Sequence, residues 1–425
     1  MRIGARAALT SRFVPSYSLQ PVETAAHRRA FLTCPDQHYA GHPHYVRPND
    51  QEIEAVFNPA HNKLFAAGGQ AARWLLLDAA GRAVGRIAAF INPTIQAREE
   101  VPVGGFGFFE CPPDPAAARL LLEEARRWLA AHGMQAMDGP VNFGDRDRFW
   151  GLHVEGHDRL PSYAMFYHPP YYRALLEDEG LQVYFRQFTY YMDVKAPLSP
   201  RIGRLADAFA NRPDIRFAHA RRADPDRLAR DLHRVYSLAW GRHDGVSTLT
   251  LDQARSLVRK MKLVIDEKII WFAYHHDEAV AMLVALPGLN QIFQLTGPNL
   301  NWWGKLKFLV EKWRWERRRD KVVNAVIYGV VPGFQGTGVD VAMCQTARPV
   351  FEARGYTDGE LVWIGDFNPK MMAVCRAFGA VVCKTHHTYR QYFDPVRPFE
   401  RSPIIGRSRK ADAGSAAASP PTSDQ

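Results

Sequence analysis

A glycine-rich turn in the second half of the chain has the residue types and spacing best suited to hold a phosphate. The turn spans 333–338 and reads Gly-Phe-Gln-Gly-Thr-Gly, between a strand-like apolar run and a helix-like segment. Glycines let backbone N–H groups come close to a ligand, and the N–H groups at a helix N-terminus attract anions. The turn lacks the Lys-Ser/Thr pair of a Walker loop and the GxGxxG spacing of a dinucleotide fold, which argues against ATP and NAD.

The elements that must position this turn occur twice in the sequence. Strand-like runs at 106–109 and 328–331 are each followed by an amphipathic helix-like segment, and a glycine, Gly133 or Gly355, ends each helix. Because self-similarity of this kind marks repeated architectures, we expect a duplicated unit.

A second block repeats in the same order. A helix-like segment at 170–180 precedes a strand in the first half, and 369–379 does so in the second. Hairpin patterns at 74–91 and 269–286 come before the first block of each half. The first half holds extra residues between its two blocks, at 139–168, which we expect to form a loop or lid. The whole pattern predicts an α/β fold with a mixed sheet, built as two tandem domains.

Five segments are expected along the chain, because its length favours two ordinary cores and its ends lack apolar periodicity. They are a basic flexible tail at 1–22, a first domain at 23–197, a linker at 198–212, a second domain at 213–396 and a disordered tail at 397–425.

Composition narrows the class of protein and its partners. The chain is 47% hydrophobic and 23% charged, without an apolar run long enough to cross a bilayer, which is typical of soluble globular proteins. Its five cysteines lack CxxC pairs, which argues against a disulfide framework and a metal site. We therefore expect a cytoplasmic protein, and the formal net charge of +10 favours anionic partners.

The turn and its flanks resemble the acyl-CoA signature of the GNAT superfamily of N-acyltransferases. The similarity covers 331–338, a strand-like run at 360–364, Asn-Pro at 368–369 and Phe-Gly-Ala at 378–380. More narrowly, most of 25–392 is similar to a group of bacterial tandem GNAT proteins. The resemblance implies two GNAT-like domains, of which the second retains the CoA-binding loop.

The resemblance also implies that acetyl-CoA or another acyl-CoA is the co-substrate, without a metal. The main chain at Gly329, Val330 and Val331 would pair with the pantetheine arm, and Asn368 would also contribute to the cofactor site. The CoA pyrophosphate would be held by Gln335, Gly336, Thr337, Gly338 and Val339.

Three features depart from the superfamily pattern. Asp340 stands where Gly or Ala is usual, and we expect its carboxylate to point away from a phosphate that it would repel. Cys375 stands where many members have a tyrosine that protonates the leaving thiolate, so the general acid stays open. In the first half, 113–116 reads Pro-Asp-Pro-Ala at the position of the loop; prolines lack N–H donors and the acid repels phosphate, so we expect that half to bind no CoA. Its resemblance to tandem Fem-type folds implies that it shapes the acceptor site instead.

Candidate catalytic residues follow from position and residue type. Glu360 and Asp366 lie near the end of the strand after the cofactor helix, where a carboxylate can take a proton from an amine; the alternative is a pair of solvated carboxylates. Tyr171 and Tyr172 are candidates for a hydroxyl acid or for the lining of the acceptor pocket, with core packing as the alternative. Glu110 ends a buried strand, where a carboxylate needs a partner, and is a further acceptor-site candidate.

Two adjacent histidines, His386 and His387, lie in a strand-like run near the end of the second half. Successive side chains of a strand point to opposite faces, so at most one of them would face a cleft. We expect both to have packing or surface roles.

A basic, tryptophan-rich helix is expected within 302–321. From Lys305 to Lys321 the chain has eight Lys or Arg residues against three acids, and apolar residues recur at helical spacing. Such a helix suits the surface of an anionic membrane on its inner face. Packing on its own domain with a solvated basic side is the alternative, and no specific nucleic-acid motif accompanies the charge.

The leading hypothesis for function is an N-acyltransferase, first of all an N-acetyltransferase, that moves an acyl group from acyl-CoA to a small-molecule or lipid amine by direct attack. Two alternatives stay open at this point. One is a Fem-like aminoacyl transferase that uses charged tRNA, and the other is a non-catalytic sensor or scaffold that binds acyl-CoA.

Overall fold

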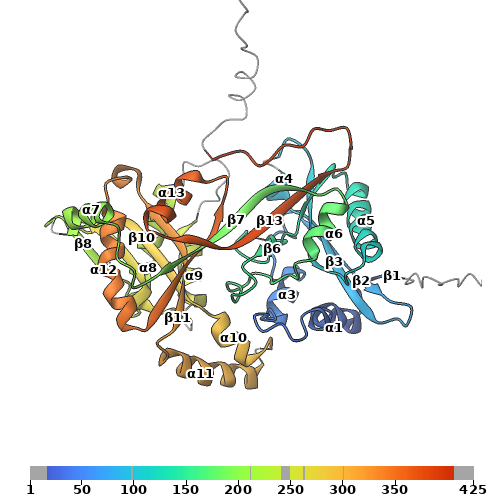
Figure 1. Ribbon diagram of the computed structural model, residues 1–425, viewed down its shortest axis with the longest axis horizontal. Coiled ribbons are helices and arrows are strands. Elements are labelled where there is room, and N and C mark those ends of the chain that lie inside the picture. Colours follow the sequence, from blue (N-terminus) through green and yellow to red (C-terminus); the bar gives the residue numbers. More distant parts are fainter. Residues whose placement is uncertain are drawn as a thin grey trace, which may run out of the picture.

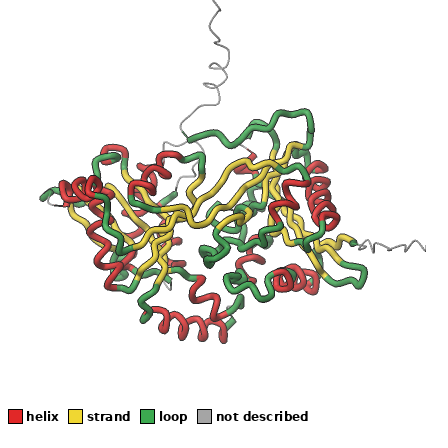
Figure 2. Tube along the Cα trace, in the orientation of Figure 1, coloured by secondary structure: helices red, strands yellow, loops and turns green. Residues whose placement is uncertain are grey.

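The strands of the chain form one sheet that runs through both halves of the molecule. The computed structural model describes residues 17–405, apart from 97–98, 145, 211, 241–248, 262–263 and 300. Within these residues the sheet has 13 strands in the order β1-β2-β3-β4-β5-β13-β7-β12-β11-β10-β9-β8, with β6 paired to β13. Figures 1 and 2 show the two longest central strands, β7 and β13, crossing from one half to the other.

The elements of the first half run from β1 to β7. They are β1 (Ser18–Pro21), α1 (Ala25–Thr33), α2 (Pro35–His38), α3 (Asp50–Val56), β2 (Gln70–Leu77), β3 (Ala83–Ile91), α4 (Pro93–Gln96), β4 (Val103–Glu110), α5 (Pro115–Ala131), β5 (Ala136–Gly139), β6 (Leu152–Glu155), α6 (Tyr172–Asp178) and β7 (Gln182–Asp193).

The elements of the second half run from α7 to β13. They are α7 (Pro200–Ala210), β8 (Ile215–His219), α8 (Pro225–Trp240), α9 (Leu251–Met261), η1 (Glu267–Ile269), β9 (Ile270–His275), β10 (Glu278–Pro287), α10 (Asn290–Thr296), α11 (Trp302–Glu316), β11 (Lys321–Val330), η2 (Pro332–Phe334), α12 (Val339–Ala353), β12 (Tyr356–Gly365), α13 (Pro369–Ala377) and β13 (Val381–Tyr392).

The predicted repeat is confirmed at the level of elements and sheet class. The unit β4-α5-β5 recurs as β11-α12-β12, and in both units the two strands are parallel and the helix connects them. The apolar stripe of each helix is buried, through Leu121, Ala125 and Leu129 in α5 and through Met343 and Ala347 in α12. The α/β fold with a mixed sheet therefore follows the sequence pattern.

The two halves exchange their last strands. Strand β13 of the second half lies between β5 and β7 of the first half, and β7 lies between β13 and β12. The guanidinium of Arg390 on β13 pairs with Asp138 on β5, with Nε–Oδ1 and Nη2–Oδ2 distances of 2.6 and 2.8 Å, and with Glu99 at 3.0 Å. The sheet of neither half is complete without the other.

The expected linker and tails contain structure. Segment 198–212 includes α7, whose Ala206 is fully buried in a cluster with Val341 and Ala342 of α12, because α7 has an apolar face to bury. Strand β1 lies inside the expected tail 1–22 and pairs with β2. Residues 397–405 also bond to the fold, from Ser402 N–H to the Tyr184 carbonyl. Residues 1–16 and 406–425 lie outside the described residues.

The extra segment of the first half, 139–168, is packed into the molecule. It contains β6, which pairs with β13, and its Phe143, Phe149 and Trp150 are buried. The expectation of a loop or lid is therefore only partly right, because most of the apolar side chains of this segment belong to the core.

Candidate functional site

Strands β11 and β12 separate in the middle of the sheet and form a fork. Their parallel pairing runs from Lys321 opposite Tyr356 to Ala325 opposite Leu361, and no pair follows. One extra residue on β12 shifts its register against β7 just after Leu361, where Trp363 has a φ of 61°. The backbone edges beyond this point face each other without a ladder between them.

A β-bulge on β11 lies at the start of the fork. On β10, Val284 is opposite Ile327 and Ala285 is opposite Ala325, which leaves Val326 as the extra residue. A bulge bends its strand and takes backbone groups out of the ladder. Backbone N–H and C=O groups are thus available inside the fork for a ligand rich in amides, such as the pantetheine arm.

The predicted pyrophosphate loop lies at the open end of the fork. After Val331, the chain forms η2, and then Gly336 and Gly338 have φ values of 72° and 99°, which favour glycine. Gly338 is the N-cap of α12, so the first amides of that helix have no partner within it. Gly336 is exposed, and a Cβ placed on it would meet nothing within 4 Å. The loop has the room and the donors that an anion needs.

The side chains of the loop turn back onto its own backbone. The Gln335 amide donates to the Val330 carbonyl at 3.0 Å, and the Thr337 hydroxyl donates to the Phe334 carbonyl at 2.7 Å. The Asp340 carboxylate accepts a hydrogen bond from Tyr328 on β11 at 2.9 Å. These bonds, together with those from the Gln335 and Thr337 amides to the Pro332 and Phe334 carbonyls, fix the shape of the loop, and they give the Asp340 carboxylate a partner of its own.

The corresponding fork of the first half is filled. Strands β4 and β5 pair only from Val103 opposite Ala136 to Gly105 opposite Asp138. The chain then turns into the gap, where Val141 N–H bonds to the Phe106 carbonyl at 2.7 Å and a Cβ on Gly107 would lie 1.8 Å from the Val141 carbonyl oxygen. No room is left there for a pantetheine arm.

The first-half turn is also closed as an anion site. Asp114 is the N-cap of α5; its carboxylate accepts from Ala116 N–H at 2.9 Å and from the Tyr17 hydroxyl at 2.9 Å. A capping carboxylate at this place occupies the donors that a phosphate would use.

Glu360 lies at the closed end of the open fork, buried among donors from distant segments. Its Oε1 accepts from Lys384 Nζ at 2.6 Å, and its Oε2 accepts from Asn324 Nδ2 at 3.1 Å and Ser162 Oγ at 3.2 Å. In the sheet, Glu360 is opposite Asn324, one position before the last pair of β11 and β12. The second half and the 139–168 segment of the first half thus meet at this carboxylate.

The other candidate residues lie in separate places. Asp366 follows β12 and pairs with Arg401 at 2.6 Å. The Tyr171 hydroxyl donates to the Cys111 carbonyl in the first half at 2.7 Å, and burial raises the pKa of this hydroxyl.

Two residues singled out in the sequence belong to α13. Asn368 is the N-cap of α13 and accepts from Met371 N–H. Cys375 is buried, and burial raises the pKa of its thiol to about 12, so it stays protonated at neutral pH.

Glu110 lies in a buried polar cluster of the first half. Its carboxylate accepts from the hydroxyls of Tyr39 and Tyr172 at 2.8 and 2.9 Å and pairs with Arg86 at 3.2 Å. Burial raises the pKa of Glu110. With these partners the carboxylate ties Tyr39, at the end of α2, to β3, β4 and α6, and Tyr172 is fully buried.

A row of buried polar side chains crosses β6, β13 and β7. His386 is opposite His153 on one side and Gln187 on the other. Both ring nitrogens of His153, Nε2 of His386 and Oε1 of Gln187 find no hydrogen-bond partner among the described residues. Burial lowers the pKa of His386 to about 3 and that of His153 well below its usual range, so both rings are neutral. Sequence reasoning missed this row, because its members come from three distant segments.

No group of three or more His, Cys, Asp or Glu side chains among the described residues is placed to hold a metal ion.

The comparisons with known proteins agree with this architecture. The chain is 28% identical over 384 residues to the bacterial ceramide synthase of Caulobacter vibrioides (strain NA1000 / CB15N), covering 88% of this chain and 97% of that protein. It is 23% identical over 372 residues to Protein YghO of Escherichia coli (strain K12), covering 85% and 92%. No family model matches the sequence.

A solved structure shares the arrangement of both halves. It is a tandem GNAT protein from the clavulanic acid biosynthesis pathway, with a TM-score of 0.50, 12% sequence identity, and coverage of 90% of this chain and 100% of that one. At this identity the likeness concerns the fold. The chain therefore has the tandem GNAT fold that its repeat and its glycine-rich turn predict.

Proposed function

We propose that the protein is an N-acyltransferase that transfers an acyl group from acyl-CoA to the amine of a long-chain lipid. The open fork between β11 and β12, with the loop 333–338 at its mouth, is the observation that supports acyl-CoA binding most directly. The fork supplies unpaired backbone edges for pantetheine, and the N-terminus of α12 supplies amides for the pyrophosphate.

The proposed site chemistry needs no covalent enzyme intermediate. Backbone N–H groups at the Val326 bulge would polarise the thioester carbonyl, as donors aimed at a developing oxyanion do. The amine nitrogen forms the new C–N bond, the C–S bond breaks, and the amine proton leaves toward a base while the thiolate of CoA takes a proton. Because Cys375 is buried within α13, a water molecule is the better source of that proton.

Glu360 has the best position among the candidate bases. It lies next to the point where β11 and β12 separate, and Lys384 holds its carboxylate in place. An acceptor amine that replaces the Ser162 hydroxyl on Oε2 would face both the carboxylate and the fork. Asp366 and Tyr171 bond to Arg401 and Cys111 instead, so we assign them no step.

The class of acceptor is proposed from the similarity to the ceramide synthase. A ceramide is the amide of a fatty acid with a long-chain amino alcohol, so its synthesis from a thioester is an N-acylation. The similarity extends over 88% of this chain and so includes residues of both halves. We therefore propose a long-chain acyl group as the donor and an amino alcohol of the sphingoid type as the acceptor.

The reaction is tested with purified full-length protein, palmitoyl-CoA and sphinganine. Release of free CoA thiol and an amide product in the mass spectrum are expected only when both substrates are present. Acetyl-CoA with short amines and charged tRNA serve as comparison donors and acceptors. Saturable CoA binding without any amide product across these acceptors would favour a sensor, and aminoacyl transfer from tRNA without CoA binding would favour a Fem-like enzyme; either result contradicts the proposal.

The role of Glu360 is tested with Glu360→Gln and Glu360→Asp. A general base contributes about 10²- to 10⁴-fold to a rate. We expect Glu360→Gln to lower kcat by at least 100-fold, on the order of that range, while the Kd for CoA stays the same, and Glu360→Asp to restore part of kcat. If both variants lost the same fraction of kcat and both had a lower melting temperature, the carboxylate would only hold the fold together.

A further inference from the structure

Helix α11 presents two apolar stripes on opposite sides. At about 100° per residue, Phe308 and Trp315 lie on one side of the helix, and both are buried. The opposite side carries exposed apolar residues. They are Trp302 (64% exposed), Trp303 (61%), Leu306, Leu309, Val310 and Trp313 (55%).

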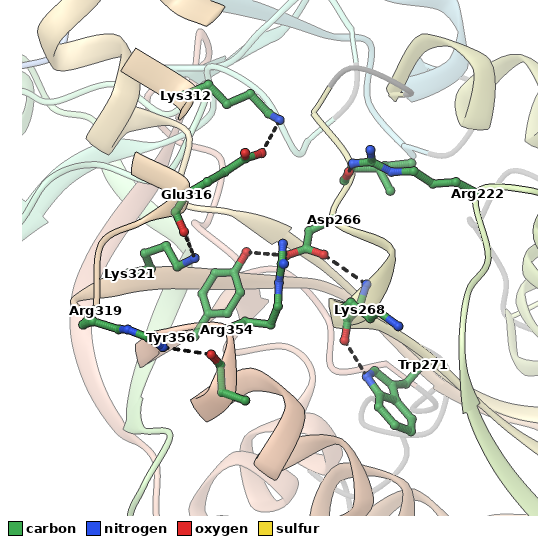
Figure 3. A network of polar contacts seen from close by, with 12 residues as sticks. Arg222, Asp266, Lys268, Trp271, Lys312, Glu316, Arg319, Lys321, Arg354 and Tyr356 are labelled. Atoms are coloured by element: carbon green, nitrogen blue, oxygen red, sulfur yellow. Dashed lines mark hydrogen bonds and ion pairs between the residues drawn. The ribbon is translucent and has the colours of Figure 1, made fainter. Parts of the chain in front are cut away.

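The buried stripe fixes the helix to the second half. Phe308 packs on Phe293 of α10 at a centroid distance of 5.2 Å, and the indole N–H of Trp315 donates to Gln291 at 2.9 Å. At the C-terminal end, Lys321 Nζ donates to the Glu316 carbonyl at 3.1 Å (Figure 3). The exposed stripe is therefore held outward by a well-anchored helix, and in Figure 1 α11 lies at the edge of the molecule.

Basic side chains flank the exposed stripe on both sides. With the same helical spacing, Lys305 and Lys312 lie along one border, where Lys312 pairs with Glu316 at 2.6 Å. Lys307 and Arg314 lie along the other, where Arg314 pairs with Glu311 at 2.7 Å, so each border keeps an excess of positive charge. Lys305, Lys307 and Arg314 are exposed. Arg317 stacks on Trp313 with 3.6 Å between its guanidinium carbon and the ring centroid, which puts one more charge beside the stripe.

We propose that α11 docks on the surface of an anionic lipid bilayer, with its axis in the plane of the membrane. Tryptophan and aliphatic side chains enter the headgroup region, and the two basic borders contact anionic headgroups. An apolar strip with cationic borders is the pattern of an interfacial helix. No helix among the described residues is long and apolar enough to cross a membrane, and a surface contact needs none.

A second copy of the chain fits the same surface less well. Two such helices facing each other across a two-fold axis bring basic border against basic border, because each interface patch meets itself. Like charges held together in this way oppose association. An anionic bilayer complements the borders, so it is the partner that the charges favour.

The docking surface also leads toward Glu360, a consequence that rests on the proposed function. Asn290 at the start of α10 donates to the Pro161 carbonyl at 2.7 Å, and Ser162, the next residue, donates to Glu360. Tyr163 stacks on Phe293 at 5.4 Å. The short segment 161–163 thus links α10, on which α11 packs, to the carboxylate of Glu360.

Co-sedimentation with vesicles tests the docking without any catalytic readout. The full chain is mixed with vesicles of phosphatidylglycerol and phosphatidylethanolamine, and in parallel with phosphatidylcholine vesicles at low and high salt. We expect the chain to bind the anionic vesicles. The triple variant Trp302→Ser/Trp303→Ser/Trp313→Ser should lower the partition coefficient at least tenfold. The variant Lys305→Glu/Lys307→Glu should lower it less, by an amount similar to the effect of high salt on the unchanged chain.

The matched control is Val381→Ser/Val382→Ser, which removes exposed apolar side chains from the start of β13. It should bind vesicles as the natural chain does. Equal binding by the tryptophan variant, or no binding to anionic vesicles by the natural chain, overturns the proposal. A dimer in light scattering that the tryptophan substitutions dissolve would assign the surface to a second copy instead. Acylation of a detergent-dispersed amine by the tryptophan variant separates a docking failure from a failure of the proposed reaction.

Discussion

The two halves of the chain use the same strand–helix–strand unit and differ in what occupies the gap between its parallel strands. In the first half, Val141 and the segment after it fill the gap between β4 and β5, and Asp114 caps the N-terminus of α5. In the second half, the gap between β11 and β12 stays open, and two glycines with positive φ precede α12. The two units therefore differ in that the chain itself fills the gap of the first, whereas the gap of the second is not bridged.

The first-half unit is directly connected to the unit β11-α12-β12. Ser162 belongs to the segment that fills the first fork, and its hydroxyl bonds to Glu360 beside the second. Strand β13 leaves the second half and completes the sheet of the first. Substitutions that affect only one half test this difference between the halves. The first concerns the exchanged strand β13.

The largest expected effect is on stability, for Arg390→Met. The guanidinium of Arg390 is buried, and its loss leaves the carboxylate of Asp138 without its partner. Breaking a buried pair costs about 3–5 kcal/mol. Denaturant unfolding of the full chain measures this cost.

Arg119→Met is the control, because Arg119 pairs with Glu179 at the surface, with an exposed guanidinium. An exposed pair contributes about 0–1 kcal/mol. Similar unfolding free energies for the two variants would show that the exchanged strand adds little to the union of the halves.

The next effect is on CoA affinity, for Gly336→Val. The new side chain occupies the space in front of the loop amides, where nothing lies within 4 Å. Losing one charge-assisted hydrogen bond costs about 1.5–3 kcal/mol, so calorimetry should show the Kd for CoA rising by about 10- to 100-fold.

Gly133→Val is matched to that change. Gly133 also has a positive φ, 81°, and open space around it, but it ends α5 in the first half. Both valines cost a similar backbone strain, about 1–2 kcal/mol, and only Gly336→Val should weaken CoA binding. A parallel loss of affinity in both would trace the effect to strain rather than to the loop.

The smallest effect is expected for Asp114→Ala. Removing an N-cap costs about 0.5–2 kcal/mol, so the melting temperature should fall by a few degrees while the Kd for CoA stays the same. Asp114 and Pro115 stand where the second half has Gly336 and Thr337. If the substitution created or removed a second CoA site in calorimetry, the closed state of the first fork would be the wrong explanation.

Much of the fold follows from the sequence, because the hairpins, the repeated helices and the turn at 333–338 are local patterns. The exchange of β7 and β13 does not follow, since an alternating strand fits any neighbour that offers an apolar face. For the same reason, α7 was not predicted within the expected linker, since its partner α12 lies far along the chain.

The site was predicted unevenly. The loop residues were placed correctly relative to the helix and strand around them, because glycine spacing is a local signal. The partners of Glu360 were not predicted, since Ser162, Asn324 and Lys384 come from three segments that only the tertiary fold brings together. Whether these residues act in catalysis stays a prediction.

The exchanged strand has a consequence for how the chain is made. Asp138 and Arg390 are 252 residues apart, and both β5 and β7 leave the ribosome before β13. Until then, the edges of β5 and β7 have no neighbour between them, and exposed edges invite wrong pairing. Nascent chains of this protein should therefore depend on holding chaperones until β13 has been made, and neither half should fold when expressed alone.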